Sequence, residues 1–345
     1  MATLTQKCPN CGGGLRFDPA SQKSRCEFCQ SEFSIGELEK ARNEGAADRT
    51  AADSADHLVG YVCDSCGAQV VTEDTTSATF CYFCHNPILL TNRLSGDFRP
   101  DRIIPFRYDR DKAIRTFLDW SRTKRFVPPG FYSASQLEKI TGLYLPFWMA
   151  DYEAEVDYAG KGVVRKVWIS GSMEYTEHKE YEIERQGTIS VAHLHEPALR
   201  RIDRDLVDSI APFDSSQAVD FSLSYLSGFF AESFDIGRDE VVPTLEERAR
   251  SYVAALLRDS IQGYGQVTET RNTVRMTPRG WHYTLFPVWI LTYRYEGKTY
   301  IYAVNGQNGR AYGELPVYKA KLNLVSGLVA AGLLALLLLG GRFLW

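Results

Sequence analysis

The sequence predicts a multidomain chain with two small N-terminal cysteine ribbons, a duplicated α+β body of mainly antiparallel sheet, and one C-terminal transmembrane helix. Three observations predict this fold class: all cysteines lie in Cys-x-x-Cys pairs before residue 98, a Pro-x-Trp motif occurs twice in the middle of the chain, and a long uncharged segment stands near its end. The predicted domains are ribbon 1 (1–35), a flexible linker (36–57), ribbon 2 (58–98), two α+β halves (99–240 and 241–318) and the transmembrane helix (322–341).

The composition is that of an ordinary globular protein. The chain has 345 residues, of which 44% are hydrophobic and 24% charged, and a formal net charge of -4. This is enough for two or three compact units and demands no strongly charged partner. The first residues contain no apolar stretch that would serve as a signal peptide, so we expect the start of the chain in the cytoplasm, with reduced cysteines.

The eight cysteines form one unit written twice. Within each set, two Cys-x-x-Cys pairs are separated by fourteen residues. Two such turns on neighbouring hairpins complete a tetrahedral sulfur site, the arrangement that structural zinc prefers. The sequence therefore predicts two zinc ribbons with one structural Zn²⁺ each. The predicted metal ligands are Cys8, Cys11, Cys26 and Cys29 in ribbon 1 and Cys63, Cys66, Cys81 and Cys84 in ribbon 2.

Other uses of these cysteines fit less well. A reducing compartment and the repeated spacing oppose a disulfide framework, and a redox motif would occur once, beside a βαβ unit. An interleaved assignment of the ligands stays open, although the equal spacing favours sequential sites. Each ribbon spans 22 residues from its first to its last cysteine, too few to bury a core, so we expect the metal to supply the folding energy. Four protein sulfurs leave no open position for a substrate, which makes the sites structural.

The charges near the ribbons disfavour nucleic acid as a partner. Between residues 61 and 90 there is no Lys or Arg, and the basic residues of ribbon 1 are nearly balanced by acidic ones. Binding a phosphate backbone would require a basic cluster. Three aromatic residues around Cys81, namely Phe80, Tyr82 and Phe83, form either a surface for a protein partner or a small core. The linker is rich in Ala, Asp and Glu and is expected to be flexible or partly helical.

The body is predicted from a second repeat. Tyr-Leu-Pro-Phe-Trp at 144–148 matches Leu-Phe-Pro-Val-Trp at 285–289, and Ile-Ile-Pro at 103–105 and Val-Val-Pro at 241–243 each precede a helix-like stretch. One helix is expected after Asp109, and another after a capping box at 244–247. Alternating patterns predict strands at 152–169, 174–183 and 293–304, and two Asn-Gly pairs at 305–309 predict turns.

No catalytic set is recognisable, so the chain is predicted not to be an enzyme, with no catalytic or cofactor-binding residue. The best candidate is His193-x-His195 followed by Glu196, because two imidazoles would face one side of a strand. No third ligand stands nearby and no phosphate-binding loop or His-Glu-x-x-His motif occurs. A shared groove between the two halves stays open as a ligand site.

The segment 322–341 predicts a membrane-spanning helix. It has no charged residue over twenty positions, and a helix of this length spans about 30 Å, the thickness of the hydrocarbon core. Lys319 and Lys321 precede it and Arg342 follows it, which favours a single-pass protein of the inner membrane with its N-terminal body in the cytoplasm.

The ordered set of features resembles a family of bacterial membrane proteins labelled transcription-factor-IIB-type zinc-ribbon-containing proteins. The resemblance covers the whole chain and depends on both ribbons, the Pro-x-Trp motifs, the Tyr-Ala-Val-Asn-Gly-Gln-Asn-Gly run that begins at Tyr302, and the C-terminal helix. Members sometimes carry a replication-helicase-like label. This sequence has no phosphate-binding loop, so it does not support a helicase activity. The resemblance implies phage-shock-type and flotillin-like proteins as partners and a role in envelope stress.

Together these features predict a tail-anchored adaptor that recruits cytoplasmic or membrane-associated proteins to the bilayer. A membrane-tethered nucleic-acid-binding protein is one alternative. The other is a ligand sensor or enzyme that uses the groove between the α+β halves.

Overall fold

The structure is a computed structural model of the chain. It describes residues 3–4, 6–45, 58–62, 69–73, 76–80, 87–90, 99–124, 126–128, 140–200, 202–296 and 298–343. Within these residues, the helices are α1 (Ile35–Gly45), α2 (Arg110–Arg122), α4 (Arg204–Ile210), α5 (Arg238–Ser260) and α6 (Lys319–Phe343), with short 3-10 helices at Ser215–Gln217 and Leu223–Leu226.

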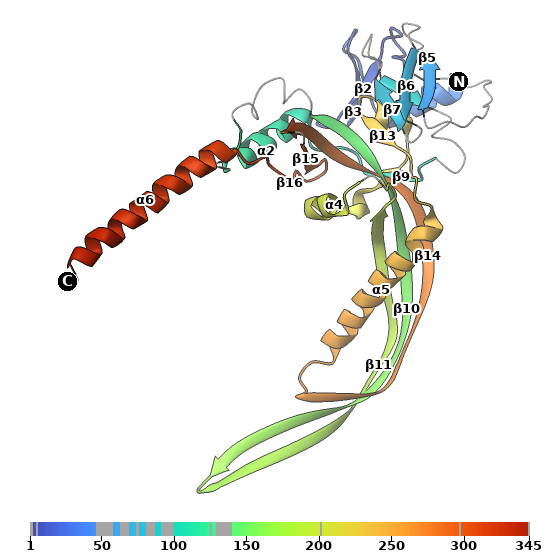
Figure 1. Cartoon of the computed structure of the whole chain (residues 1–345). Helices are drawn as coiled ribbons and strands as arrows, with labels where there is room; N and C mark the ends of the chain where they lie inside the picture. The colour runs from blue at the N-terminus through green and yellow to red at the C-terminus, as the bar shows by residue number, and fades with distance from the viewer. Residues whose placement is uncertain are drawn as a thin grey trace.

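Three long strands form the centre of the body. Strand β10 (Thr141–Ser170) lies between β11 (Met173–Pro197) and β14 (Gln266–Tyr295) and is antiparallel to both. These strands bend into an arc, with α5 on its inner side (Figure 1). In the part of the chain that the structure describes, they belong to a sheet of 11 strands. The prediction of an α+β body with mainly antiparallel sheet is confirmed, and the predicted strands 152–169 and 174–183 lie within β10 and β11.

The two Pro-x-Trp motifs lie side by side in this sheet. Tyr144 of β10 pairs with Pro287 of β14, and Pro146 pairs with Leu285, so each motif meets the other in a reciprocal register. Strand β13 (Phe230–Glu232) adds to β10 in parallel, as β9 (Arg102–Ile103) adds to β14. The two motifs therefore form a single structural centre, not the centres of two separate units.

Helix α2 confirms the first helix prediction. Asp109 is its N-cap and accepts a hydrogen bond from the Lys112 backbone N–H at 2.7 Å. Ala113 and Phe117, one turn apart on one face, are fully buried. This spacing is what places apolar residues on one side of a helix.

Helix α5 corrects the second prediction. It begins at Arg238 after the N-cap Gly237, so the predicted capping box at 244–247 lies inside the helix. Glu240 supplies the capping carboxylate instead and accepts from the Gly237 N–H at 3.2 Å. The predicted match of 103–105 with 241–243 is wrong too, because Ile103 lies in a strand and Val241 in this helix. Gly237 was not predicted as the N-cap, because Pro243 indicated a helix boundary after it.

The two faces of the long strands differ in chemistry. On one face, Ala154, Val156 and Tyr158 are buried beneath α5. On the other face, the alternating residues of β10 form ion pairs with β14, and these pairs are Glu153 with Arg279 at 2.6 Å, Glu155 with Arg275 at 3.4 Å and Asp157 with Arg271 at 2.8 Å. The strand alternation thus gives the arc one apolar face and one charged face.

The largest core lies where the two motifs pair. The Phe106 ring stacks on Phe229 at a centroid distance of 4.3 Å and contacts Tyr144 and Trp289 at 5.0 and 5.1 Å. A smaller core beneath α4 includes Phe147 and the other members Ile104, Leu145, Val207, Ile210, Phe213, Phe286, Val288 and Ala303. Aromatic burial of this size is the main source of the body's stability.

The N-terminal region is joined to the body. A small sheet of β2 (Leu15–Asp18), β3 (Lys23–Cys26) and β4 (Glu32–Phe33) precedes α1. The linker at 36–57, predicted to be flexible or partly helical, begins with this helix, whose Leu38 is buried against Cys8 and Leu15. A capping box between Ser34 and Glu37 explains the start of the helix.

The region 58–98 also contributes to the large sheet. Its strands are β5 (Leu58–Val62), β6 (Gln69–Glu73), β7 (Thr76–Phe80) and β8 (Pro87–Leu90). Strand β7 pairs with β13 of the body, and β1 (Thr3–Leu4) pairs with β8. Strands on both sides of the predicted boundary at residue 98 therefore belong to one sheet. The second cysteine region supplies part of the sheet of the body.

The C-terminal part ends in an exposed helix. The strand predicted at 293–304 is a hairpin, because β14 ends at Tyr295 and β15 (Lys298–Asn305) folds back on it. The Asn-Gly turns are confirmed between β15 and β16 (Ala311–Gly313). Elsewhere in the same sheet, β12 (Val219–Asp220) pairs with β9. Among the described residues, α6 is the helix long and apolar enough to cross a membrane, and no residue of its stretch Lys319–Leu337 is buried in the body.

Candidate metal centre

Four cysteine sulfurs converge at the N-terminal end of the fold. The Sγ atoms of Cys8 and Cys29 lie 3.6 Å apart and those of Cys11 and Cys26 lie 3.5 Å apart. All four Sγ atoms lie within 4.8 Å of one another. Sulfurs at 2.3 Å from one tetrahedral zinc ion would be separated by about 3.8 Å. The set therefore has the size and donor type of a four-sulfur metal site.

The two Cys-x-x-Cys turns have the same backbone geometry. In each turn, the residue four positions after the first cysteine donates its backbone N–H to the carbonyl of that cysteine. Gly12 donates to Cys8 at 2.8 Å, and Gln30 donates to Cys26 at 3.0 Å. Gly12 and Gln30 have φ angles of 74° and 60°. Glycine adopts this left-handed conformation without steric cost, whereas Gln30 pays for it. The structure thus uses one conformation twice to direct both pairs at one point.

The thiols influence one another strongly. The Ser31 hydroxyl and backbone N–H lower the pKa of the Cys29 thiol to about 6, whereas the pKa of Cys11 is raised to about 12, since contacts with Cys29 and Cys26 outweigh the bond from the Gly13 backbone. Several negative thiolates this close together repel each other unless a cation lies between them. Metal binding to this set would therefore release protons.

Little apolar burial supports the site. Leu15 and Leu38 are the buried aliphatic residues around Cys8 and Cys26, with Phe33 partly buried beside them. Space is tight on one side, because a Cβ atom on Gly13 would lie 2.5 Å from the Phe28 ring and 3.3 Å from the Cys26 sulfur. Such a small cluster supports the expectation that a metal is needed for stability.

The second cysteine set, Cys63, Cys66, Cys81 and Cys84, lies outside the described residues, but the strands that flank it are described. In ribbon 1, the residue before each pair's first cysteine bridges the residue six positions after that cysteine, as Lys7 does with Gly14 and Arg25 with Glu32. The flanking strands of the second set have the same register, in the pairs Val62 with Gln69 and Phe80 with Pro87. All four cysteine pairs thus occur between strand residues paired in the same register.

The first cysteine site is packed against the body. Phe17 of β2 belongs to the main core, with its ring 5.1 Å from Tyr225, and its backbone N–H donates to the Ser227 carbonyl at 2.8 Å. The Gln22 side-chain amide donates to the Phe106 carbonyl at 2.7 Å. These contacts hold ribbon 1 against the body.

Two of the basic side chains of ribbon 1 have acidic partners within the ribbon. Arg16 pairs with Glu27 at 2.9 Å and Lys23 lies 4.0 Å from Glu32. Positive charge that is already neutralised contributes little to binding a phosphate backbone.

The histidine candidates do not converge on a site. His193 lies at an irregularity of β11 with φ of 60°, and its N–H donates to Asp151 at 2.6 Å. His195 packs against Phe147 and Phe286 with ring centroids 5.8 and 5.1 Å away, and burial lowers its pKa. Within the described part of the chain, no metal-ligand cluster includes either histidine.

Glu196 has a structural role that the sequence did not indicate. Its carboxylate is 1% exposed and pairs with Arg248 of α5 at 2.9 Å and with Arg204 of α4. Arg248 also donates to the His195 carbonyl at 2.9 Å. Because two arginines surround this buried carboxylate, it joins two helices to β11.

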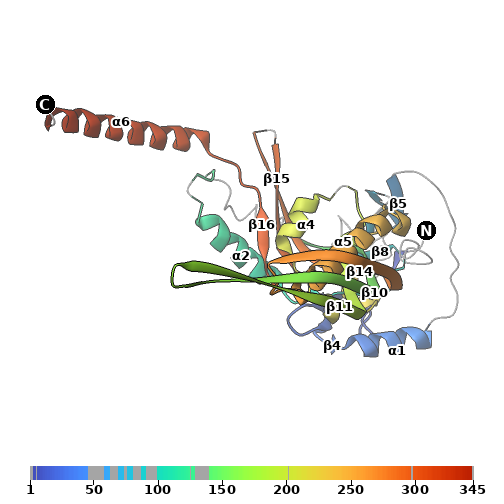
Figure 2. The same cartoon turned by 90° about the horizontal axis from the view of Figure 1, so that it is seen from below.

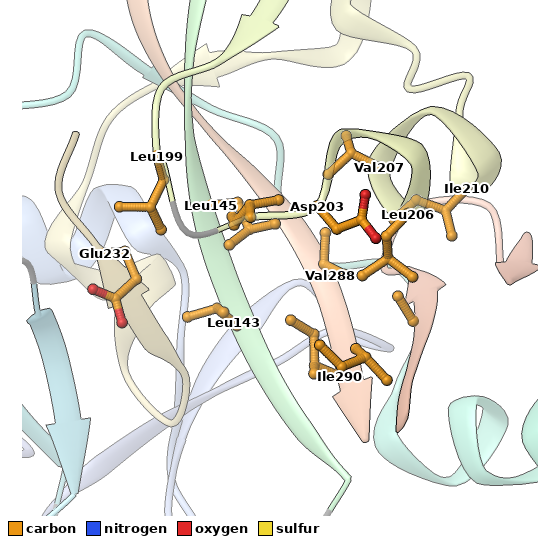
Figure 3. A pocket seen from close by; sticks show the side chains of 13 residues that line it. Leu143, Leu145, Leu199, Asp203, Leu206, Val207, Ile210, Glu232, Val288 and Ile290 are labelled. Carbon is orange, nitrogen blue, oxygen red and sulfur yellow. The ribbon is translucent and has the colours of Figure 1, made fainter. Parts of the chain in front are cut away.

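A cavity of about 250 Å³ lies between α4 and the sheet (Figure 3). Its wall is mainly aliphatic and comes from β10, β14, β15 and α4, with the side chains of Leu143, Leu145, Leu206, Val207, Ile210, Val288, Ile290, Ile301 and Ala303. The ionisable residues at its edge are Asp203 and Glu232. Asp203 is used as the N-cap of α4, accepting from Asp205 N–H at 2.9 Å. The cavity suits an apolar group better than proton-transfer chemistry.

Comparison with known proteins gives a relative of the same length. The chain is 32% identical over 345 residues to the uncharacterized protein YdjG of Bacillus subtilis (strain 168), and the match covers 99% of both chains. No family model matches the chain, and no solved structure matches it.

Proposed function

We propose that this chain, which belongs to the same family as the uncharacterized protein YdjG of Bacillus subtilis, is a membrane-anchored adaptor. It recruits cytoplasmic or membrane-associated proteins to the inner membrane through its zinc-ribbon region. The observation that carries this proposal is a closed four-cysteine site packed on a body whose chain continues into a bare apolar helix. Four sulfurs leave no position for a substrate, so the site suits binding better than catalysis.

Two structural Zn²⁺ ions are part of the proposal. The short sulfur separations in ribbon 1 suit a d¹⁰ ion that accepts tetrahedral thiolate ligands. The common register of the strands around all four cysteine pairs supports a second site formed by Cys63, Cys66, Cys81 and Cys84. The convergence of the sulfurs of Cys8, Cys11, Cys26 and Cys29 within 4.8 Å of one another favours sequential over interleaved ligand sets.

Helix α6 fixes the complex to the bilayer. Two lysines precede its uncharged segment and one arginine follows it, which favours a single-pass, tail-anchored protein with its body in the cytoplasm. The Tyr318 N–H donates to the Phe126 carbonyl at 2.7 Å, and Lys319 pairs with Glu296 at 3.5 Å. These contacts tie the start of the helix to the body, so a partner bound to the ribbon would be held near the membrane.

Phage-shock-type and flotillin-like proteins are the partner class we propose, in a response to envelope stress. The exposed surface of ribbon 1 offers one anchor residue, because the Phe28 side chain is 74% exposed beside the metal ligands. Exposed aromatic residues contribute strongly to protein interfaces.

Internal duplication is a further part of the proposed history of the body. Each half would contain a short strand, a helix and a long strand that turns into a hairpin. The first half then begins at β9, which contains Ile103 of the Ile-Ile-Pro segment, and the second half begins at β13 instead of at the Val-Val-Pro segment, which lies in α5. The reciprocal pairing of the two Pro-x-Trp motifs is what a two-fold arrangement of such halves produces.

The adaptor proposal is tested by purifying the detergent-solubilised full chain from cells, with wild type, Cys8→Ser/Cys11→Ser and Cys63→Ser/Cys66→Ser compared. Zinc is quantified in each sample and the captured proteins are identified. We expect two zinc ions in wild type, one in each double variant, and loss of specific protein partners from at least one variant that remains in the membrane. Identical partners in all three samples would sink the adaptor role.

The cavity beneath α4 supports a second candidate function, that of a sensor for an apolar ligand. Native mass spectrometry of the purified chain would reveal a co-purified small molecule. Leu145→Trp fills the cavity and should remove the bound molecule from the spectrum. Val219→Trp, at an exposed site, should leave the bound molecule in place. A clean wild-type spectrum from several preparations would count against this function. The paired basic residues of ribbon 1 do not favour the nucleic-acid alternative.

A further inference from the structure

The hairpin of β10 and β11 extends beyond the rest of the sheet. The pairing of β14 with β10 ends at Val163, opposite Gln266. Beyond this point β10 and β11 pair only with each other, until the turn between Ser170 and Met173. We call the segment 164–179 the hairpin tip. A two-stranded hairpin without a covering layer has little stability of its own, so a tip with apolar residues needs an explanation.

The end of the hairpin tip is rich in exposed apolar side chains. Their exposed fractions are 45% for Val167, 43% for Trp168, 73% for Ile169, 58% for Met173 and 40% for Tyr175. The strand register places Trp168, Met173 and Tyr175 on one face of the tip and Val167 and Ile169 on the other, so the end of the hairpin is apolar on both faces. Exposed apolar side chains gathered at one end of an element mark a binding site.

The side chains are ordered along the tip in a way that suits a membrane interface. Ile169 and Met173 lie next to the turn, and Trp168 stacks on Tyr175 behind them, with a centroid distance of 5.6 Å and an interplanar angle of 12°. Lys166 follows, with its Nζ 6.0 Å from the Trp168 ring. Membrane interfaces show this order: aliphatic residues lie in the acyl region, aromatic rings lie at the headgroups, and a lysine lies above them.

The fold directs this tip to the side where the membrane anchor leaves the body. In Figure 1, α6 leaves the upper end of the arc and the β10–β11 hairpin forms its lower end, and both project to the left, the open side of the arc; Figure 2 shows the same leftward direction from below. If α6 crosses the bilayer, as the proposed function requires, the tip lies on the membrane side of the body. A bilayer is therefore the apolar phase nearest to it.

We propose that the hairpin tip inserts into the headgroup and acyl boundary of the bilayer that α6 spans, as a second contact that fixes the tilt of the body. The tip carries both positive and negative charges. In the strand register, Lys166 lies opposite Glu177, and Glu174 lies opposite the apolar Ile169. Apolar burial thus drives the contact, and neutral phospholipid is sufficient. Insertion is shallow, because Glu174 has to remain in the headgroup layer.

The first experiment measures the surroundings of Trp168 in the full chain in phosphatidylcholine nanodiscs. Tryptophan emission is compared between ordinary lipid and lipid brominated on the acyl chains, for wild type and Trp168→Phe. We expect brominated lipid to quench a component of the wild-type emission that Trp168→Phe lacks. The C-terminal Trp345 serves as an internal reference, because it is common to both proteins.

The second experiment changes the apolar end. Ile169→Asp/Met173→Asp should abolish lipid quenching of Trp168 and expose that ring to aqueous iodide. The matched control is Tyr252→Asp/Leu256→Asp on α5, where the two side chains are 50% and 52% exposed, and it should leave the quenching unchanged. Circular dichroism confirms that both variants are folded.

Three results would separate the possible failures. Quenching of wild-type Trp168 by iodide and not by lipid overturns the inference. Protection of Trp168 from both quenchers overturns it too, because a second copy or a protein would then cover the tip. Extraction of the whole chain from membranes at alkaline pH would instead refute the α6 anchor, a result that is independent of Trp168.

Discussion

The cysteine ribbon and the body reach stability in opposite ways. Around the four sulfurs, the buried residues beyond Cys8 and Cys26 are Leu15 and Leu38, whereas the body buries large aromatic side chains such as Phe106 and Phe147 completely. A few aliphatic contacts do not offset the conformational entropy of a hairpin pair, but an aromatic core on a wide sheet does. This difference predicts that the ribbon needs a bound metal ion to fold, whereas the body does not.

Phe17 provides an aromatic contact between the two regions, beside the hydrogen bond from Gln22 to the Phe106 carbonyl. Phe17 comes from the ribbon's sheet, yet its ring packs with Tyr225 and Phe229 of the body. Folding of the ribbon therefore completes the surface of the main core. Loss of metal should therefore lower the stability of the body through this contact.

The largest expected effect is loss of a metal ligand. Cys26→Ser should remove one bound metal ion and unfold ribbon 1, because metal binding contributes on the order of 10–16 kcal/mol to small zinc modules. Metal content and limited proteolysis measure the two outcomes. Ser21→Ala, in the exposed turn of the same ribbon, should change neither. A ribbon that resists protease without its metal would contradict the comparison.

Truncation in the body should show the reverse pattern. Phe106→Ala leaves a cavity among Tyr144, Phe229 and Trp289 and should lower the free energy of unfolding of the body by about 3–5 kcal/mol. The metal content should remain that of wild type. Chemical unfolding followed by fluorescence provides the measurement, and Tyr312→Ala, at a ring that is 41% exposed, is the control. Loss of metal from Phe106→Ala would mean that the two regions fold as one unit.

The sequence predicted the ribbon chemistry better than the layout of the body. Two Cys-x-x-Cys pairs at a fixed spacing predict a site because the ligands are local and glycine marks the turn at Gly12. Helix α2 was predictable for the same reason, since Asp109 and its apolar face lie within four turns of chain. Helix α5 was predicted to start too late, because Pro243 within its second turn suggested an end, not an interior.

Long-range pairing was beyond prediction. Nothing local shows that the Pro-x-Trp motifs pair with each other, that β7 adds to β13, or that Phe17 enters the main core. The role of Glu196 was missed because its two arginine partners come from helices 8 and 52 residues away in sequence. The signal for a buried carboxylate is a partner in space, which an isolated sequence does not reveal.

A smaller effect tests the joint between the regions. Phe17→Ala should cost about 1.5–3 kcal/mol of burial while the ribbon keeps its metal. In wild type, a chelator should lower the melting temperature of the body, and in Phe17→Ala this shift should shrink. Phe28→Ala, an exposed aromatic of the same ribbon, should retain the wild-type shift. An unchanged shift in Phe17→Ala would show that the two regions communicate elsewhere.

The smallest expected effect compares helix caps. Asp109→Ala removes the N-cap of α2 and should lower the stability of the body by about 1 kcal/mol. Partial burial opposes ionisation of Asp109, but the Lys112 backbone N–H and ammonium outweigh it and lower the carboxyl pKa below 3.8. A carboxyl with a lowered pKa stabilises the fold above its ordinary pKa, and this contribution disappears as the pH falls through the lowered value.

The melting temperatures of wild type and Asp109→Ala should therefore differ at pH 7 and converge at an acid pH below the lowered pKa of Asp109. Asp119→Ala, on the exposed side of the same helix with its side chain 78% exposed, should match wild type at both pH values. Glu37→Ala removes the corresponding carboxylate cap of α1 in the ribbon. Its effect should be undetectable while metal is bound, because the metal dominates the stability of that region. A clear loss of ribbon stability in metal-bound Glu37→Ala would show that local caps matter there as much as in the body.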